Sequence, residues 1–142
     1  MNSNKLRVVI DTNILLVSVS SKSQYHRIFR KIPDGEPDVF VTNEILTEYE
    51  EIIASKYNQA MSKDVVRALM KLPNVHRQEI YYKWNLIYED PDDNKFADCA
   101  VSANADYLVS NDKHFHVLAK IRFPKIRVIP IKLFEKILFE GI

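Results

Sequence analysis

Two aspartates each end a short apolar stretch of this 142-residue chain. Residues 6–10 (LRVVI) run into Asp11, and residues 107–110 (YLVS) run into Asn111 and Asp112. Both stretches predict strands of a parallel sheet covered on both faces, because polar and apolar residues hardly alternate in them. Ligands of open α/β sheets bind beyond the carboxyl ends of the strands, so neighbouring strands would bring Asp11 and Asp112 together. Two such carboxylates repel each other unless a cation lies between them. The pattern therefore predicts a divalent-metal site suited to phosphate chemistry.

The composition predicts one globular domain over residues 1–142, with 46% hydrophobic and 27% charged residues. The net charge of +1 gives no bulk attraction to nucleic acid. One cysteine, Cys99, excludes an internal disulfide and fits a cytoplasmic location. The residues Met1–Lys5 contain no apolar stretch typical of a signal peptide. No apolar run is long enough to span a membrane, so no membrane partner is predicted. With Gly35 and Gly141 as the only glycines, Walker-A and dinucleotide-binding motifs are excluded.

Predicted strands and helices alternate along the chain, which indicates an α/β fold with a mainly parallel sheet. Besides the two strands above, strands are predicted at 38–41 and, at an edge of the sheet, 126–129. Helices are predicted at 14–31, interrupted by the polar residues 18–23, and at 42–57, 62–71, 90–104 and 131–139, with a short helix after Asp112. Residues 75–88 are ambiguous between helix and strand.

The helix predicted at 90–104 carries a further acid on its apolar side. At about 100° per residue, Asp93 falls on the stripe that is formed by Phe96, Ala97, Ala100 and Ala103. An ionised carboxylate facing the core is costly unless it is paired or bound to a ligand, although a first-turn aspartate can also simply favour the helix dipole. Asp98 points to the opposite side and is predicted to be solvated, and Asp92 is the better N-cap.

For Asp11 and for the glutamates of the helix at 42–57, the sequence leaves two interpretations open. Asp11 could be an ordinary helix N-cap, with Asn13 placed to brace its carboxylate by a hydrogen bond. In the helix that Thr42 caps, Glu48 and Glu50 flank the apolar stripe on opposite edges, and periodicity does not choose between them.

The remaining polar and aromatic groups indicate less chemistry. His114 and His116 are predicted to be surface residues, because no cysteine or third histidine lies nearby in the sequence to complete a metal site. Cys99 is predicted in the core, and Trp84 is a core or interface residue. The segments 113–127 and 22–31 hold five and four Lys or Arg residues and no acid. Such runs are usually solvated surface, but these adjoin the predicted crevice and could hold a nucleic acid backbone.

The acidic blocks, taken in order, resemble the PIN-domain family. They are Asp11-Thr12-Asn13, Glu48 within ILTE, Asp93 within DDNKF, and residues 103–112 (ANADYLVSND). The chain looks most like the bacterial branch described as toxin components of toxin–antitoxin systems, and the resemblance covers essentially the whole chain. It implies a three-layer fold with a central, mainly parallel sheet flanked by helices, and it matches Glu48 rather than Glu50. Ser110 stands where the family usually has threonine, and Asn111 replaces the commoner glycine.

The resemblance implies a metal-dependent ribonuclease acting on single-stranded or structured RNA. By position, the resemblance implies four catalytic acids: Asp11, Glu48, Asp93 and Asp112. The ligands of Mg²⁺ or Mn²⁺ would be Asp11, Asp93 and Asp112, and the supporting residues around them would be Asn13 and Ser110. A cognate antitoxin protein and a homodimer are the implied protein partners, and the apolar residues of the predicted helix 131–139 could form an interface.

Two alternatives remain open. One is a catalytically inactive PIN-like module that binds RNA or protein. The other is a phosphatase or phosphotransferase that uses Asp11 as nucleophile, although the Asp-x-Asp start common in such enzymes is missing because residue 13 is asparagine.

Overall fold

The computed structural model describes residues 5–141, and its centre is a five-stranded sheet in the order β3-β2-β1-β4-β5. The strands are β1 (Arg7–Ile10), β2 (Asp38–Val41), β3 (Val75–Arg77), β4 (Tyr107–Val109) and β5 (Val128–Ile129). All neighbouring pairs are parallel. The predicted α/β class is confirmed, and β5 is the edge strand that the sequence predicts. The expectation for the first residues of the chain lies outside the described part.

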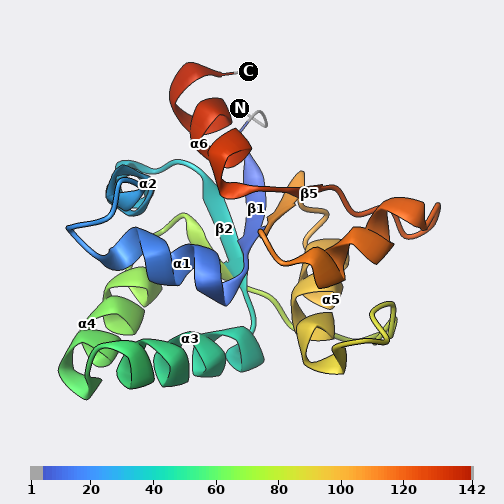
Figure 1. Ribbon diagram of the computed structural model, residues 1–142, viewed down its shortest axis with the longest axis horizontal. Helices are drawn as coiled ribbons and strands as arrows, with labels where there is room; N and C mark the ends of the chain where they lie inside the picture. Colours follow the sequence, from blue (N-terminus) through green and yellow to red (C-terminus); the bar gives the residue numbers. More distant parts are fainter. Residues whose placement is uncertain (1–4, 142) are drawn as a thin grey trace.

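Helices cover both faces of this sheet. They are α1 (Thr12–Val19), α2 (His26–Lys31), α3 (Asn43–Lys56), α4 (Gln59–Met70), α5 (Asn94–Ser102) and α6 (Ile131–Glu140), with 3₁₀ turns η1 (Ile32–Asp34), η2 (Pro91–Asp93) and η3 (Lys113–Lys120). Figure 1 shows α1 to α4 on one side of the strands and α5 on the other, which is the three-layer arrangement. No helix within residues 5–141 is long and apolar enough to cross a membrane.

The central strand β1 and its neighbour β4 are covered on both faces beyond their first residues, as their mostly apolar sequences predict. Val8 and Val9 of β1 and Leu108 and Val109 of β4 have no exposed surface. In the register of this pair, Ile10 lies opposite Val109. The residues that follow the two strands are therefore held side by side at the carboxyl edge of the sheet, on a rigid part of the core.

Several element boundaries differ from the predictions for local reasons. Helix α4 begins three residues early because the Asn58 side chain caps it, accepting from the Met61 N–H at 2.8 Å. The predicted helix 14–31 is divided into α1 and α2. In the ambiguous segment 75–88, only β3 is regular, and the chain from 78 to 90 crosses to the other face of the sheet without a helix or strand.

Two predictions about the helix at 90–104 are wrong. Asp98 is only 6% exposed, and its carboxylate accepts a hydrogen bond from the Trp84 N–H at 3.1 Å. The irregular segment 78–90 covers this side of α5, which the periodicity of the helix alone did not reveal. Asp92 does not cap α5, because its side chain pairs with Lys95 at 3.0 Å and Asp93 occupies the cap position.

Candidate metal centre

Asp11 lies directly after β1, in extended backbone conformation, and its N–H donates to the carbonyl of Val109 at 3.0 Å. The side chain is 5% exposed and makes no capping hydrogen bond to α1. Its Oδ2 atom instead accepts a hydrogen bond from the Ser110 hydroxyl at 2.7 Å. Asp11 therefore occupies the N-cap position of α1 without a side-chain capping bond, and Ser110 braces its carboxylate.

Asp112 is tied to the same hydroxyl, since its backbone N–H donates to Ser110 Oγ at 2.9 Å. The Asp112 side chain caps η3, accepting from the His114 N–H at 2.9 Å. Ser110 thus links the acids that follow β1 and β4. The predicted convergence of Asp11 and Asp112 is present, and both residues line one hollow with Asn13 and Asn111.

Asp93 reaches this cluster from the N-terminal end of α5. Its side chain is 15% exposed and, like Asp11, makes no capping hydrogen bond. The Oδ2 atom is buried and, among the described residues, has no hydrogen-bond partner. Asp93, which the sequence places on the apolar stripe of the helix, is therefore a partly buried carboxylate. A capping hydrogen bond to α5 does not account for its burial.

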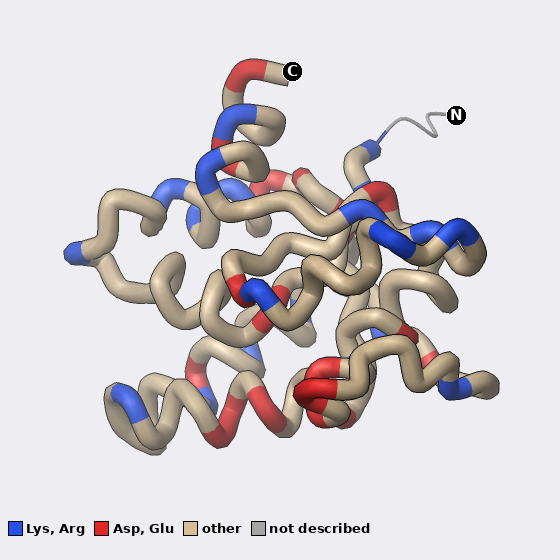
Figure 2. Tube along the Cα trace, turned by 45° about the vertical axis from the view of Figure 1, so that its right-hand side comes forward, with Lys and Arg blue, Asp and Glu red and all other residues tan. Residues whose placement is uncertain are grey.

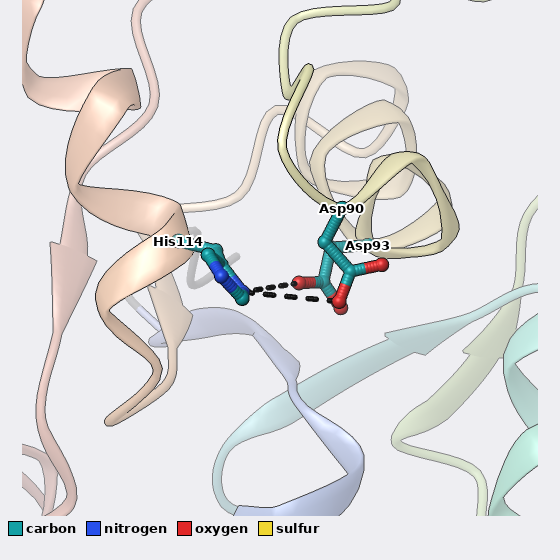
Figure 3. A group of neighbouring side chains, drawn as sticks. All are labelled: Asp90, Asp93 and His114. Atoms are coloured by element: carbon teal, nitrogen blue, oxygen red, sulfur yellow. Dashed lines mark ion pairs between the residues drawn. The ribbon is translucent and has the colours of Figure 1, made fainter.

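His114 belongs to the cluster: its side chain is 32% exposed, so it is partly buried and not simply the surface residue that the sequence predicts. Its Nδ1 atom lies 3.2 Å from Asp112, 3.8 Å from Asp90 and 3.9 Å from Asp93. Figure 3 shows the imidazole of His114 facing the carboxylates of Asp90 and Asp93 across the gap between η3 and the start of α5. Nδ1 is buried and makes no hydrogen bond within residues 5–141. One atom each of Asp90, Asp93 and His114 could bind a single ion, because these atoms lie within 4.8 Å of one another. The signal that the sequence offered was the position of His114, two residues after a predicted metal ligand.

Glu48 lies at the rim of the site, and its contacts distinguish it from Glu50. The Thr12 hydroxyl donates to one of its carboxylate oxygens, and the Lys95 ammonium lies 2.8 Å from the other. Thr12 directly follows Asp11, so α3, α1 and α5 meet at this carboxylate. Among the described residues, the Glu50 side chain makes no hydrogen bond or ion pair with the site.

The two inward-facing aspartates have raised pKa values. Burial raises the pKa of Asp11 to about 6, with additions from Asp112 and Glu48, against the lowering effect of the Ser110 hydrogen bond. Burial raises the pKa of Asp93 to about 7, and the neighbouring charges of Asp90, Asp11 and Asp112 add to this effect. Carboxylates in this arrangement are destabilised as anions at neutral pH, which a bound cation would relieve.

The donor set fits a divalent metal ion. Carboxylate oxygens suit hard ions such as Mg²⁺ and Mn²⁺, and an imidazole nitrogen adds affinity for transition ions such as Mn²⁺. The unpartnered Asp93 Oδ2 and His114 Nδ1 atoms face this centre. Asn13 is exposed and, within residues 5–141, makes no hydrogen bond to Asp11. Asn111 accepts from the Ile131 N–H at 3.0 Å and so connects the loop to α6.

Comparisons with known proteins identify the family and the fold. A family model described as a PIN domain matches residues 7–114, which include every residue of the site. No curated protein sequence matches the chain. The fold is similar to a chain of the crystal structure of VapBC2 from Rickettsia felis bound to a DNA fragment from their promoter. The TM-score is 0.61 at 14% sequence identity, covering 88% of this chain and 98% of that one.

Proposed function

Because the chain belongs to the PIN-domain family, we propose that it is a metal-dependent ribonuclease that hydrolyses phosphodiester bonds of single-stranded or structured RNA. The observation that carries this proposal is the convergence of Asp11, Asp93 and Asp112 at the carboxyl edge of the sheet. Two of these carboxylates have pKa values of about 6 and about 7. A site that only stabilised the fold would gain nothing from placing mutually repelling acids together.

In this proposal, Asp11, Asp93 and Asp112 hold Mg²⁺ or Mn²⁺, and His114 and Asp90 complete the wall of the site. When bound, a divalent ion supplies Lewis acidity that lowers the pKa of water and offsets the negative charge of a phosphate. The Ser110 hydroxyl fixes the orientation of the Asp11 carboxylate. This hydrogen bond also keeps the pKa of Asp11 lower than burial alone would set it.

Glu48 would orient the attacking water, because its own position is fixed from two sides by Thr12 and Lys95. Burial lowers the pKa of Lys95, but hydrogen bonds to Glu48 and Asp92 outweigh this effect and raise it. Lys95 therefore stays an ammonium group at the rim. We propose that this charge, paired with Glu48 at 2.8 Å and Asp92 at 3.0 Å, offsets these two acids and so reduces their repulsion of the substrate phosphate.

Positive charge farther out would hold the RNA backbone. Figure 2 shows Lys and Arg positions along the stretch between η3 and β5, whereas Asp and Glu positions gather in α3 and around the start of α5. Lys113 directly follows Asp112, so the basic stretch begins at the proposed centre. Phosphate contacts of this kind position a strand without reading its sequence.

The biological role that we propose is that of the toxin of a toxin–antitoxin pair, held inactive by a cognate antitoxin protein in the cytoplasm. The fold neighbour from VapBC2, found in a complex on promoter DNA, supports this role. A homodimer is also proposed, through α6, where Leu133 is exposed and Ile137, Leu138 and Phe139 are partly exposed.

The test is cleavage of a single-stranded RNA by the purified protein with Mn²⁺ or Mg²⁺ and with EDTA. Wild type should cleave only with the ion, and Asp11→Asn should abolish cleavage because the amide keeps the shape but removes the charge. Asp64→Asn, on the exposed face of α4, is the matched control and should cleave like wild type. An Asp11→Asn protein that cleaves at the wild-type rate would rule out the assigned site. A metal-loaded wild type that binds RNA without cleaving it would favour the inactive module instead.

A further inference from the structure

Three aromatic side chains from two distant segments form an exposed cluster, here called the aromatic patch: Tyr82, Trp84 and Phe123. The ring centroids of Tyr82 and Trp84 lie 4.7 Å apart, and those of Trp84 and Phe123 lie 5.8 Å apart, both in edge-to-face geometry. Tyr82 is 65% exposed and Phe123 is 80% exposed. Large apolar rings that remain this accessible next to one another often indicate a binding surface.

The patch is held in place by the segment between β3 and α5. The Trp84 N–H is fixed by Asp98 of α5, as described above. Three residues on, Ile87 is buried and exchanges two hydrogen bonds with the Asn94 side chain, at 2.9 and 3.1 Å. These contacts hold the irregular segment against α5 at Trp84 and at Ile87. The aromatic rings are therefore preorganised, which lowers the entropy cost of binding.

Three basic residues lie within two positions of the patch residues in the sequence. Lys83, Arg122 and Lys125 are exposed, and no carboxylate within residues 5–141 lies at ion-pair distance from them. The nearby Asp98 carboxylate is buried under Trp84, and it is the only acid among the hydrogen-bond partners of the patch. Aromatic rings flanked by exposed basic side chains complement a polyanion that carries flat bases.

The patch is also connected to the proposed metal centre. A hollow runs from the Trp84 segment to the rim of the site, and its charged lining consists of two lysines and three acids: Lys83, Lys95, Glu44, Asp92 and Asp98. On the other side, η3 leads from His114 toward Phe123. Its eight residues span about 16 Å at the 3₁₀ rise of about 2 Å per residue.

We propose that the aromatic patch binds unpaired bases of a single-stranded nucleic acid by stacking, while the neighbouring cations contact its backbone. The proposal rests on the proposed function, because it assigns a second contact to the substrate strand. Every base has an aromatic face, so the contact would favour single strands over duplexes without selecting a sequence. The substrate class is then RNA with an unpaired stretch extending beyond the cleaved bond.

Trp84 provides a direct probe, because it is the only tryptophan in the chain. The experiment titrates the full-length protein with a short oligouridylate in EDTA, so that no cleavage occurs. Trp84 fluorescence reports contact at the patch, and the anisotropy of a labelled oligonucleotide reports affinity. We expect saturable quenching by the single strand, and no quenching by a duplex of the same length. Absence of quenching by the single strand, or equal quenching by the duplex, would overturn the proposal.

Substitutions at Phe123 separate stacking from general apolar contact. Phe123→Ala and Phe123→Leu should weaken oligouridylate binding by about 5- to 150-fold, the range for loss of one stacked base, whereas Phe123→Tyr should bind like wild type. Tyr88→Ala is the matched control, because Tyr88 is 84% exposed but is not part of the patch. Far-UV circular dichroism would verify the fold of each variant, and since Phe123 is exposed, we expect no change. Wild-type affinity of a folded Phe123→Leu protein would contradict stacking and would instead fit a protein-docking surface.

This inference and the proposed nuclease activity fail separately. Quenching in EDTA without any RNA cleavage in Mn²⁺ would keep the patch as a nucleic acid site and reject the ribonuclease. Cleavage in Mn²⁺ without quenching in EDTA would keep the ribonuclease and reject the patch.

Discussion

The Ser110 hydroxyl donates a 2.7 Å hydrogen bond to the Asp11 carboxylate, although the two residues are 99 positions apart in the chain. The hydroxyl also accepts from the Asp112 N–H at 2.9 Å. One small side chain therefore fixes the relative position of the two acids that follow the neighbouring strands β1 and β4. In the proposed metal centre it acts as an outer-shell group that orients a ligand.

Removal of this hydroxyl should weaken metal binding. In Ser110→Ala the pKa of Asp11 should rise above about 6, because the hydrogen bond that lowers it is lost. The affinity for Mn²⁺ near neutral pH should then fall by about 10- to 100-fold, measured by calorimetric titration. Ser110→Thr keeps the hydroxyl and should retain wild-type affinity. Equal losses in the alanine and threonine variants would mean that packing, and not the hydroxyl, matters.

The contacts of Glu48 predict a selective effect on activity. Glu48→Gln should reduce the rate of RNA cleavage at least about tenfold, because the amide weakens the ion pair with Lys95 and no longer offers a full carboxylate to a water. Glu50→Gln should change the rate little, since its side chain lies outside the site. Steady-state cleavage of a fluorescent RNA compares the two variants. Losses of the same size in both would remove the assigned role of Glu48.

The raised pKa of Asp93 predicts how the stability of the metal-free protein depends on pH. Asp93 has a pKa of about 7 in the folded chain, against 3.8 when exposed, so the folded state binds more protons between these values. The contribution of Asp93 to stability is thus fully present below pH 3.8 and is lost as the pH rises through about 7. Thermal melts in EDTA should show this decline in wild type and a flatter profile in Asp93→Asn. A variant that melts lower than wild type at neutral pH would instead indicate a structural role for the carboxylate.

His114 should influence which ion binds. An imidazole favours transition ions over Mg²⁺, so His114→Asn should reduce the affinity for Mn²⁺ by about 10- to 100-fold and the affinity for Mg²⁺ less. His116→Asn is the natural control, since His116 is exposed in the same 3₁₀ segment. Competition between the two ions, followed by Mn²⁺ electron paramagnetic resonance, would measure the preference. If both histidine variants keep the wild-type preference, His114 has no part in the metal centre.

The sheet and the positions of Asp11 and Asp112 could be predicted from the sequence because both depend on local patterns. Unbroken apolar stretches predict covered strands, and a parallel sheet brings their ends together. Asp93 was found in the same way, since a charged residue on an apolar helix stripe conflicts with its surroundings. The choice between Glu48 and Glu50 needed the resemblance, because periodicity describes one helix and not the helices packed against it.

What could not be predicted depends on the segment between β3 and α5. Its sequence is ambiguous between helix and strand, so its path over α5 could not be foreseen. That path buries Asp98, whose interpretation as a solvated residue was wrong for this reason. It also places Trp84 beside Phe123, a contact between positions that no pattern within either segment connects. His114 was misjudged because its environment comes from the start of α5, which lies about twenty residues earlier in the sequence.

The most direct test of the account is the calorimetric titration of Mn²⁺ into metal-free wild type and Asp93→Asn near neutral pH. Asp93 is the relevant position because its buried Oδ2 atom has no hydrogen-bond partner among the described residues and faces the other acids. Wild type should bind Mn²⁺ and release protons as it does so, because the pKa values of Asp11 and Asp93 are about 6 and about 7. A hundredfold excess of the ion over its dissociation constant should stabilise wild type by about 2.7 kcal/mol. Asp93→Asn should bind at least about tenfold more weakly and release fewer protons. Wild-type affinity and proton release in Asp93→Asn would contradict the metal centre described here.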